Sequence, residues 1–277
     1  MTTLYVLGSG SRGNCFAIEC DGAVLLLDAG FSAKEIEKRA AKVSLDLSRV
    51  VGIAITHEHG DHANGAERLA GRYSVPLFTA PSTFAAVCSD PSTIAFRALH
   101  SAAAAEVGPF AISACRTPHD ASAPQALAVH TCGGITLGVA YDLGRVTAGV
   151  RYLLRGLCAL ILESNYDEVL LRTSKYPPSV QQRIAGNGGH LSNHAAADLL
   201  SELCHGELGT VVLAHLSQQC NTEDAARSAV GPALRRAGFR GTLHVARQDE
   251  PLPPIELVPG DGVQLGLGLG VGTVHRA

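Results

Sequence analysis

Short apolar runs alternate with turn residues along most of the chain. Their length and their content of Val, Ile, Leu and Phe predict buried strands. The predicted strands are Thr3–Leu7, Cys15–Cys20, Ala23–Leu27, Val50–Ile55, Leu77–Thr79, Phe110–Cys115, Ala126–Thr131, Ile135–Ala140, Leu157–Leu162, Thr210–Ala214 and Thr242–Ala246. Two pairs of neighbouring runs are separated only by short turns at Asp21-Gly22 and Gly133-Gly134, which predicts two hairpins.

Helical periodicity occupies several segments between these strands. Ser32 and Glu35 have the spacing of a capping box, which predicts the start of a helix. The other predicted helices are about Asp61–Arg72, Arg145–Arg155, Pro178–Ala185, about His194–Cys204 and about Glu223–Ala237. Because hairpins are mixed with helical crossovers, a simple doubly wound parallel sheet does not fit. The pattern predicts an α/β fold with α+β layering, in which two mixed sheets have helices outside.

The domain organisation follows from composition along the chain. No linker or internal repeat interrupts residues 1–250, so these are expected to form one domain. The composition then shifts to Pro and Gly, and residues 251–277 are expected to form an irregular tail.

Overall composition excludes several classes of protein. Of 277 residues, 46% are hydrophobic, which excludes a disordered chain. A net charge of −3 provides no global positive field, so a nucleic-acid site must be a local patch. No continuous apolar segment has the length of a membrane span, and the first residues lack the basic region of a signal peptide. We therefore expect a cytoplasmic protein with no membrane partner, in which the 8 scattered cysteines are mostly buried hydrophobes.

The segment with the densest metal-ligand chemistry is Thr-His-Glu-His-Gly-Asp-His, residues 56–62, directly after a predicted buried strand. Residues i and i+2 of an extended turn point the same way, so His57 and His59 can share a metal ion. Asp61 and His62 begin the next predicted helix and can turn toward a second one. So many titratable groups in one place are not expected without a cation to hold them.

Three further ligand-type residues follow predicted strands elsewhere in the chain. His119, Asp142 and His215 each lie just beyond the carboxyl end of such a strand. The His57–His62 segment supplies too few ligands for two metal ions, and these residues are the candidates for the remainder.

With these motifs in this order, together with Asp28, the sequence resembles the metallo-β-lactamase superfamily, an αββα sandwich. The resemblance implies that His57, His59 and His119 bind one metal ion, that Asp61, His62 and His215 bind another, and that Asp142 bridges them. Asp28 resembles the buried Asp that orients a ligand loop from behind. A set of five His and two Asp suits two divalent ions, Zn²⁺ or Mn²⁺ and also Fe²⁺.

Other stretches point to one branch of that superfamily. Gly-Ser-Gly-Ser-Arg-Gly-Asn-Cys (8–15), Glu-Ser-Asn (163–165), Gly-His-Leu-Ser-Asn (189–193) and His-Leu-Ser-Gln-Gln-Cys-Asn-Thr (215–222) resemble the YycJ/WalJ-type proteins. That resemblance implies a metal-dependent phosphodiesterase or nuclease, of the DNA 5′ exonuclease type, which uses a metal-bridging hydroxide. Tyr141 departs from the branch, which usually has Thr before the bridging Asp.

The resemblance also suggests residues for catalysis and for contact with a nucleic-acid or phosphodiester substrate. Asp61 is expected to orient or deprotonate the attacking water, and His190 to contact the scissile phosphate or protonate the leaving oxygen. The candidates for supporting or substrate-contacting roles are Asp28, Arg12, Asn14, Glu163, Asn165, Ser192 and Asn193. For Ser192 and Asn193 the alternative is simple capping of a helix, and for Glu163 and Asn165 it is formation of a turn after the preceding strand.

Two alternatives to a nuclease remain open at this stage. One is a hydrolase of small esters, thioesters or lactones on the same metal site, which a closed apolar pocket would favour. The other is a metal-dependent binding module without catalysis. The sequence does not determine the metal, the direction of cleavage or the oligomeric state.

Overall fold

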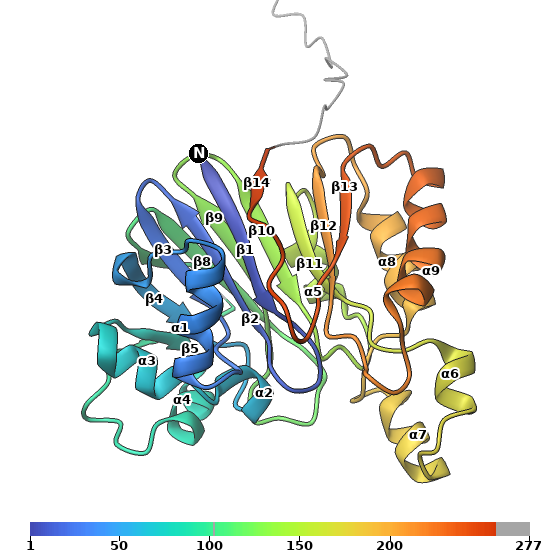
Figure 1. Ribbon diagram of the computed structural model, residues 1–277, viewed down its shortest axis with the longest axis horizontal. Helices are drawn as coiled ribbons and strands as arrows, with labels where there is room; N and C mark the ends of the chain where they lie inside the picture. The colour runs from blue at the N-terminus through green and yellow to red at the C-terminus, as the bar shows by residue number, and fades with distance from the viewer. Residues whose placement is uncertain (102, 259–277) are drawn as a thin grey trace, which may run out of the picture.

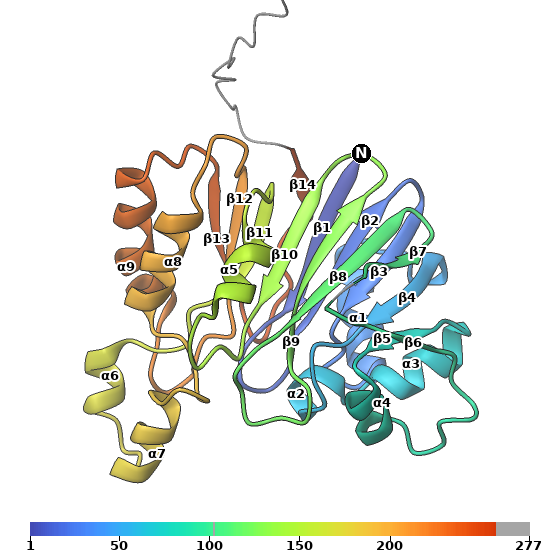
Figure 2. The same ribbon diagram turned by 180° about the vertical axis from the view of Figure 1, so that it is seen from behind.

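The computed structural model describes residues 1–101 and 103–258. Two seven-stranded sheets pack face to face, and helices cover both outer faces, as Figures 1 and 2 show from opposite sides. The layering of two mixed sheets with helices outside is confirmed.

The first sheet is built from the N-terminal half of the chain and closed by one late strand. Its order is β14-β1-β2-β3-β4-β5-β6, antiparallel from β14 to β3 and parallel from β3 to β6. The strands are β1 (Thr2–Gly8), β2 (Cys15–Cys20), β3 (Ala23–Leu27), β4 (Val50–Ala54), β5 (Leu77–Thr79), β6 (Phe96–Ala98) and β14 (Ile255–Leu257).

The second sheet contains the remaining strands in the order β13-β12-β11-β10-β9-β8-β7. It is parallel from β13 to β10 and antiparallel from β10 to β7. The strands are β7 (Ala105–Val107), β8 (Phe110–Arg116), β9 (Gln125–Thr131), β10 (Thr136–Ala140), β11 (Ala159–Glu163), β12 (Thr210–Ala214) and β13 (Thr242–Val245).

Helices pack on the outer faces through their apolar sides. They are α1 (Ala33–Lys42), α2 (Gly60–Ala63), α3 (Ala66–Tyr73), α4 (Pro81–Val87), α5 (Ala148–Leu154), α6 (Glu168–Arg172), α7 (Pro178–Ile184), α8 (Asn193–Leu203) and α9 (Glu223–Arg236), with a 3₁₀ turn at Leu47–Arg49. Helices α1 and α3 share an apolar cluster with the first sheet, and α5, α8 and α9 share one with the second. A third cluster fills the space between the sheets, where Phe16, Phe78 and Phe110 are almost fully buried.

Most predicted strands are present with their bounds shifted by no more than a few residues, and both hairpins form. The capping box also forms, since Ser32 Oγ accepts the backbone N–H of Glu35. The prediction of a single helix over residues 61–72 is wrong. It is broken into α2 and α3 at Asn64-Gly65, because the N–H of Gly65 leaves the helix to bond the carbonyl of Ala29 at 2.8 Å. Helices α4 and α6 and the three-residue strands β6 and β7 were not predicted.

The chain after residue 250 differs in part from the expected irregular tail. Residues 255–257 form β14, which pairs antiparallel with the start of β1 and extends the first sheet. The apolar residues of this strand, Ile255 and Leu257, are buried in the core between the sheets. The rest of the expected tail, from residue 259, lies outside the described residues.

Strand ends from both sheets meet at one edge of the sandwich, near α2 in Figure 1. Three residues just beyond these ends have positive φ, namely Asp28 (55°) after β3, Asp142 (54°) after β10 and His215 (55°) after β12. This left-handed conformation is uncommon for residues other than Gly and costs about 1–3 kcal/mol in strained cases. The same edge carries α6 and α7, which extend beyond the sheets in both views.

Among the helices of the described chain, none combines the length and the apolar character that crossing a bilayer requires.

Candidate metal centre and its cleft

All seven predicted metal ligands meet at this edge. His57 lies in the turn after β4, His59 caps α2, and Asp61 and His62 lie in its only full turn. His119 follows β8, Asp142 follows β10, and His215 follows β12. We call these seven residues the floor of the cleft.

The floor contains groups with the spacing of metal ligands. One is His57, His59 and His119, and another is Asp61, His62 and His215, with the ligand atoms of each group within 4.8 Å of one another. Asp142 joins the two groups, because its Oδ2 lies 3.5 Å from His57 Nε2 and 2.9 Å from His62 Nε2. Its Oδ1 lies 3.7 Å from His119 Nε2 and 3.5 Å from His215 Nδ1.

The surroundings of one buried oxygen of Asp142 indicate whether these residues fit a metal ion. Asp142 Oδ2 accepts no hydrogen bond of normal geometry in the described structure, although His62 Nε2 lies 2.9 Å from it, and a buried carboxylate oxygen is costly to leave unpaired. Near it, His57 Nε2 faces His59 Nδ1 at 3.1 Å. A divalent cation satisfies nitrogen and oxygen lone pairs that converge in this way, and the mixed donor set suits Zn²⁺, Mn²⁺ or Fe²⁺. The residues therefore fit a divalent metal centre.

For three of the histidines, the nitrogen that faces away from the centre has its own partner. His57 Nδ1 lies 3.0 Å from Thr56 Oγ1, and His62 Nδ1 lies 2.6 Å from Asp28 Oδ2. His119 Nδ1 lies 3.0 Å from the carbonyl oxygen of Gly188. Such partners fix the tautomer and ring orientation, leaving Nε2 available to a metal.

Asp28 is fully buried behind the floor and contacts three elements. Its Oδ1 accepts the N–H of Thr56 at 2.7 Å, and its Oδ2 accepts the hydroxyl groups of Thr56 at 2.8 Å and Tyr141 at 2.6 Å. With His62 Nδ1 at the same Oδ2, the carboxylate connects the turns after β3, β4 and β10. These contacts hold Asp28 in its left-handed backbone conformation and support the role predicted for it.

The loop after β3 also packs closely on the segment that carries Asp61. A Cβ atom at Gly30 would overlap the carbonyl oxygen of Asp61, so only glycine fits there. Asn14 binds the same carbonyl through its backbone N–H at 2.8 Å and through Nδ2 at 3.2 Å. Asn14 thus supports the backbone of a ligand and does not line the cleft.

Charges within the floor perturb one another strongly. Burial raises the pKa of Asp142, but the imidazoles of His215 and His62 outweigh it and hold that pKa well below its usual range. Burial would lower the pKa of His215, but the carboxylates of Asp142, Asp61 and Glu163 raise it to about 9. Burial also lowers the pKa of His57 well below its usual value. Such opposed shifts in one cleft are typical of functional sites.

His190 lies at the edge of the floor and pairs with two carboxylates. Its Nδ1 is 2.8 Å from Glu163 Oε1 and 3.1 Å from Asp142 Oδ1. Burial would lower the pKa of His190, but Glu163 and Asp142 raise it to about 10. The two carboxylates therefore favour the protonated form of this imidazole.

Glu163, at the end of β11, has a larger set of contacts than expected for a turn residue. Its Oε2 accepts the backbone N–H groups of Leu143 at 2.8 Å and Leu191 at 3.0 Å, while its Oε1 lies 3.1 Å from His215 Nδ1. This fully buried carboxylate therefore orients His190 and His215 together.

The remaining predicted residues have different positions. Asn165 lines the cleft and donates through Nδ2 to the carbonyl of His215 at 2.8 Å. Ser192 caps α8, and Asn193 is buried in a network with Ser164 and Asn221, so both stabilise the turn after His190. The structure does not bring Arg12 into the cleft, since its guanidinium pairs with Asp249 at 2.6 Å.

Sequence reasoning assigned no role to three residues that support the floor. Thr56 and Tyr141 bind Asp28, and Ser9 Oγ accepts the backbone N–H of His215 at 2.8 Å. Two of these residues could have been noticed from their neighbours in the sequence. Thr56 directly precedes His57, and Tyr141 directly precedes Asp142 at the position where the sequence departs from the branch it resembles.

The floor opens into a cleft of about 410 Å³. One wall is formed by residues 166–190, which carry α6 and α7 and which we call the arm. Tyr176, Arg183, Ile184, Gly188 and Gly189 of the arm line the cleft. Its lining is mainly polar, and Asp120 lies at its rim.

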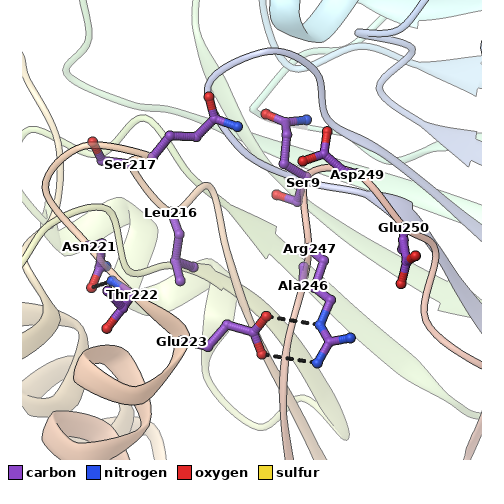
Figure 3. A pocket seen from close by; sticks show the side chains of 12 residues that line it. Ser9, Leu216, Ser217, Asn221, Thr222, Glu223, Ala246, Arg247, Asp249 and Glu250 are labelled. Carbon is purple, nitrogen blue, oxygen red and sulfur yellow. Dashed lines mark hydrogen bonds and ion pairs between the residues drawn. The ribbon is translucent and has the colours of Figure 1, made fainter.

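A second hollow of about 420 Å³ lies beside the cleft, between the loops that follow β12 and β13. Figure 3 shows Arg247 pointing across it to Glu223, with which it forms an ion pair of 2.9 Å. Asp249, which also lines this hollow, is the partner of Arg12. Because both arginines are paired, this hollow does not offer a free cationic site.

The sequence is also similar to proteins of known family. The family model of the metallo-beta-lactamase superfamily matches residues 8–114. The chain is 32% identical to exodeoxyribonuclease YycJ of Bacillus anthracis, over 84% of this chain and 89% of that protein. It is 28% identical to exodeoxyribonuclease WalJ of Streptococcus pneumoniae, over 84% of this chain and 88% of the relative.

Solved structures agree on the fold. The metallo-beta-lactamase fold protein YhfI of Bacillus subtilis superposes with a TM-score of 0.69 at 17% identity, covering 91% of this chain and 98% of YhfI. The short form of human tRNase Z superposes with a TM-score of 0.62 at 18% identity, covering 91% and 98% of the two chains.

Proposed function

The chain belongs to the metallo-β-lactamase superfamily, in the branch of YycJ and WalJ, and on that premise we propose that it is a metal-dependent exodeoxyribonuclease. The observation that carries the proposal is Asp142, whose buried Oδ2 lies 2.9 Å from His62 Nε2 and 3.5 Å from His57 Nε2 and accepts no hydrogen bond of normal geometry from the described residues. Both of its curated relatives quoted above carry the name exodeoxyribonuclease.

The proposal places two divalent ions on the floor. His57, His59 and His119 would hold one, Asp61, His62 and His215 the other, and Asp142 would contribute to both. When bound, divalent cations at such a site polarise phosphoryl oxygens and acidify water, which provides a nucleophile at neutral pH. Zn²⁺ and Mn²⁺ both suit this donor set.

Asp61 would act on the attacking water. Its carboxylate is about a quarter exposed, lines the cleft and keeps its charge, because His215 and His62 outweigh its burial and lower its pKa. Its Oδ2 lies 3.3 Å from the Nε2 atoms of both histidines, which restricts its orientation. A charged, oriented carboxylate facing the cleft can align the attacking water molecule by accepting a hydrogen bond from it.

His190 would donate a proton to the leaving oxygen. Its ring lines the cleft and is about a quarter exposed. Glu163 at 2.8 Å favours the protonated form, which carries the proton that departure of an alkoxide requires. Acid and base would thus both act from the lining of the same cleft.

The lining of the cleft favours a phosphodiester over a small apolar ester. Polar and charged side chains of Ser11, Asp120, Asn165, Arg183 and Ser217 surround the floor. Pockets for small apolar molecules are instead lined mainly by hydrophobic side chains.

A substrate panel with the metal-reconstituted protein tests the proposal. It contains 5′-labelled DNA, the same sequence as RNA, bis-p-nitrophenyl phosphate and a thioester. We expect hydrolysis of DNA and of the model phosphodiester, which chelation abolishes and Zn²⁺ or Mn²⁺ restores. Turnover of the thioester alone would contradict the proposal and favour small-molecule hydrolysis.

A further inference from the structure

The arm carries two side chains in the cleft that the catalytic scheme does not use. We propose that Arg183 and Tyr176 form a nucleotide subsite, in which Arg183 binds the phosphate next to the scissile one and Tyr176 stacks on an unpaired base. This inference rests on the proposed function, because it assigns the part of a single-stranded DNA end that the arm would bind.

The charge distribution around the cleft singles out Arg183. Among the described residues that line the cleft, it is the only Lys or Arg, whereas Asp61, Asp120 and Asp142 are acidic. The guanidinium of Arg183 forms no ion pair within residues 1–101 and 103–258. A polyanion needs a cation beyond the floor for its neighbouring phosphate, and an unpaired guanidinium fits that role in charge and geometry.

Tyr176 supplies the aromatic surface. It is the only residue with a Phe, Tyr or Trp ring among the described lining residues. One side of it packs in an apolar cluster with Tyr166, Leu171 and Ile184, and its carbonyl accepts Gln181 Nε2 at 2.9 Å. The ring is therefore anchored and half-buried, and it also lines the cleft. Aromatic rings with one free face bind bases of single strands by stacking, largely without regard to sequence.

The arm is tied to the floor, which fixes the subsite relative to the reacting centre. Within the arm, the backbone N–H of His190 donates to the carbonyl of Ile184 at 2.8 Å, which fixes the residue after Arg183 beside His190. Gly188 accepts His119 Nδ1, and a Cβ atom at Gly144 would overlap the carbonyl of Asn187. Figures 1 and 2 show α7 extending beyond the sheets on this side of the molecule.

Arg172 provides a matched control on the same arm. It is exposed like Arg183 but lines a separate hollow between α6 and α7, with Tyr166 and Gln181. Both arginines therefore contribute the same charge to the arm, and only Arg183 lines the cleft that holds the floor.

The experiment compares wild type, R183A, R172A, Y176A and Y176F in two measurements. One is kcat/KM for a 5′-labelled single-stranded oligonucleotide and for bis-p-nitrophenyl phosphate, which lacks a neighbouring nucleotide. The other is binding of a fluorescent oligonucleotide by anisotropy across a range of salt concentrations. The first uses the metal-reconstituted protein, and the second is also run without metal.

We expect R183A to weaken oligonucleotide binding and kcat/KM by about tenfold or more and to reduce the log–log salt slope by about 0.7, the loss of one phosphate contact. Y176A should lose about tenfold, whereas Y176F, which keeps the ring, should behave like wild type. Turnover of bis-p-nitrophenyl phosphate should stay within about threefold, and R172A should match wild type throughout.

Two outcomes would overturn the subsite. If R183A and R172A weaken oligonucleotide binding equally, Arg183 contributes only general surface charge. If R183A or Y176A loses as much activity on bis-p-nitrophenyl phosphate as on the oligonucleotide, the residue supports the structure of the floor and does not bind a neighbouring nucleotide. Wild type that hydrolyses DNA without dependence on Arg183 refutes the subsite and leaves the proposed function intact. Arg183-dependent binding without hydrolysis refutes the function and supports the subsite.

Discussion

The floor of the cleft is buried and held by hydrogen bonds from several elements, whereas the arm beside it is mostly exposed and built from two short helices. Asp28, Glu163 and Asp142 have side chains with little or no exposure, and each contacts two or more elements. By contrast, α7 has no buried residue. The difference assigns separate tasks to the two regions, because a rigid floor suits bond cleavage and a peripheral arm suits contact with substrate.

The largest loss of activity should come from Asp61, the floor residue proposed to act on the attacking water. Asp61→Asn keeps the shape of the side chain but removes the charge that orients the attacking water and helps to hold a metal ion, so kcat should fall by about 10⁴-fold. The fold should persist, with a thermal midpoint within a few degrees of wild type. Asp120→Asn, at the rim of the same cleft, is the control and should keep most activity. A normal kcat in a fully metallated Asp61→Asn protein would remove Asp61 from the mechanism.

The next effect concerns His190, at the boundary between floor and arm. His190→Ala should keep its metal ions and lose about 10²–10³-fold in DNA hydrolysis, the range for loss of an acid or charge-stabilising group. The loss should be much smaller for bis-p-nitrophenyl phosphate, because p-nitrophenolate leaves without a proton. His194→Ala, an exposed histidine paired with Glu168 at 2.8 Å, is the control. Equal losses on both substrates would contradict proton donation.

A smaller effect should follow from the carboxylate behind His190. Glu163→Gln keeps one acceptor for Leu143 and Leu191 but weakens the orientation of His190 and His215. Loss of such a supporting contact typically costs about 10–100-fold in metal affinity or activity. Metal titration and kcat on DNA measure both quantities, with Glu168→Gln as the surface control. An unchanged metal affinity together with unchanged kcat would show that His190 and His215 are oriented without Glu163.

The smallest effect should come from Tyr141, which touches the floor only through Asp28. Tyr141→Phe removes the hydroxyl group that donates to Asp28 at 2.6 Å and leaves the ring in the core. Loss of one hydrogen bond to a charged group should lower the thermal midpoint by about 3–6 °C and weaken metal binding only a few-fold. Tyr152→Phe, 82% exposed, is the control. A complete loss of metal in Tyr141→Phe would mean that Asp28 depends on this single contact.

The contrast between the floor and the exposed arm also explains which parts of the site could be predicted from the sequence. Residues 57–62 are contiguous and follow a strand with a strong apolar pattern, so their chemistry and position were both evident. His119, Asp142 and His215 were found because each lies shortly after the carboxyl end of such a strand. The exposed, mostly polar arm has no comparable pattern, and the residues that line the cleft there depend on tertiary contacts of the Gly188-Gly189 turn with His119 and Ile184.

Two errors in the fold prediction have a similar origin. The break between α2 and α3 depends on a hydrogen bond from Gly65 to Ala29, which is distant in sequence. Strand β14 has three residues and gains its stability by pairing with β1. Local propensity contains no information on either contact, because each partner lies in a separate part of the chain.

The most direct test of the account is the metal content of the reconstituted protein, measured together with DNA hydrolysis. Wild type should bind about two equivalents, His215→Ala about one with loss of hydrolysis, and His130→Ala, an exposed histidine on β9, about two with normal hydrolysis. A single equivalent in wild type that His215→Ala leaves unchanged would contradict the two-ion floor. Hydrolysis of DNA by metal-free protein would contradict the account as a whole.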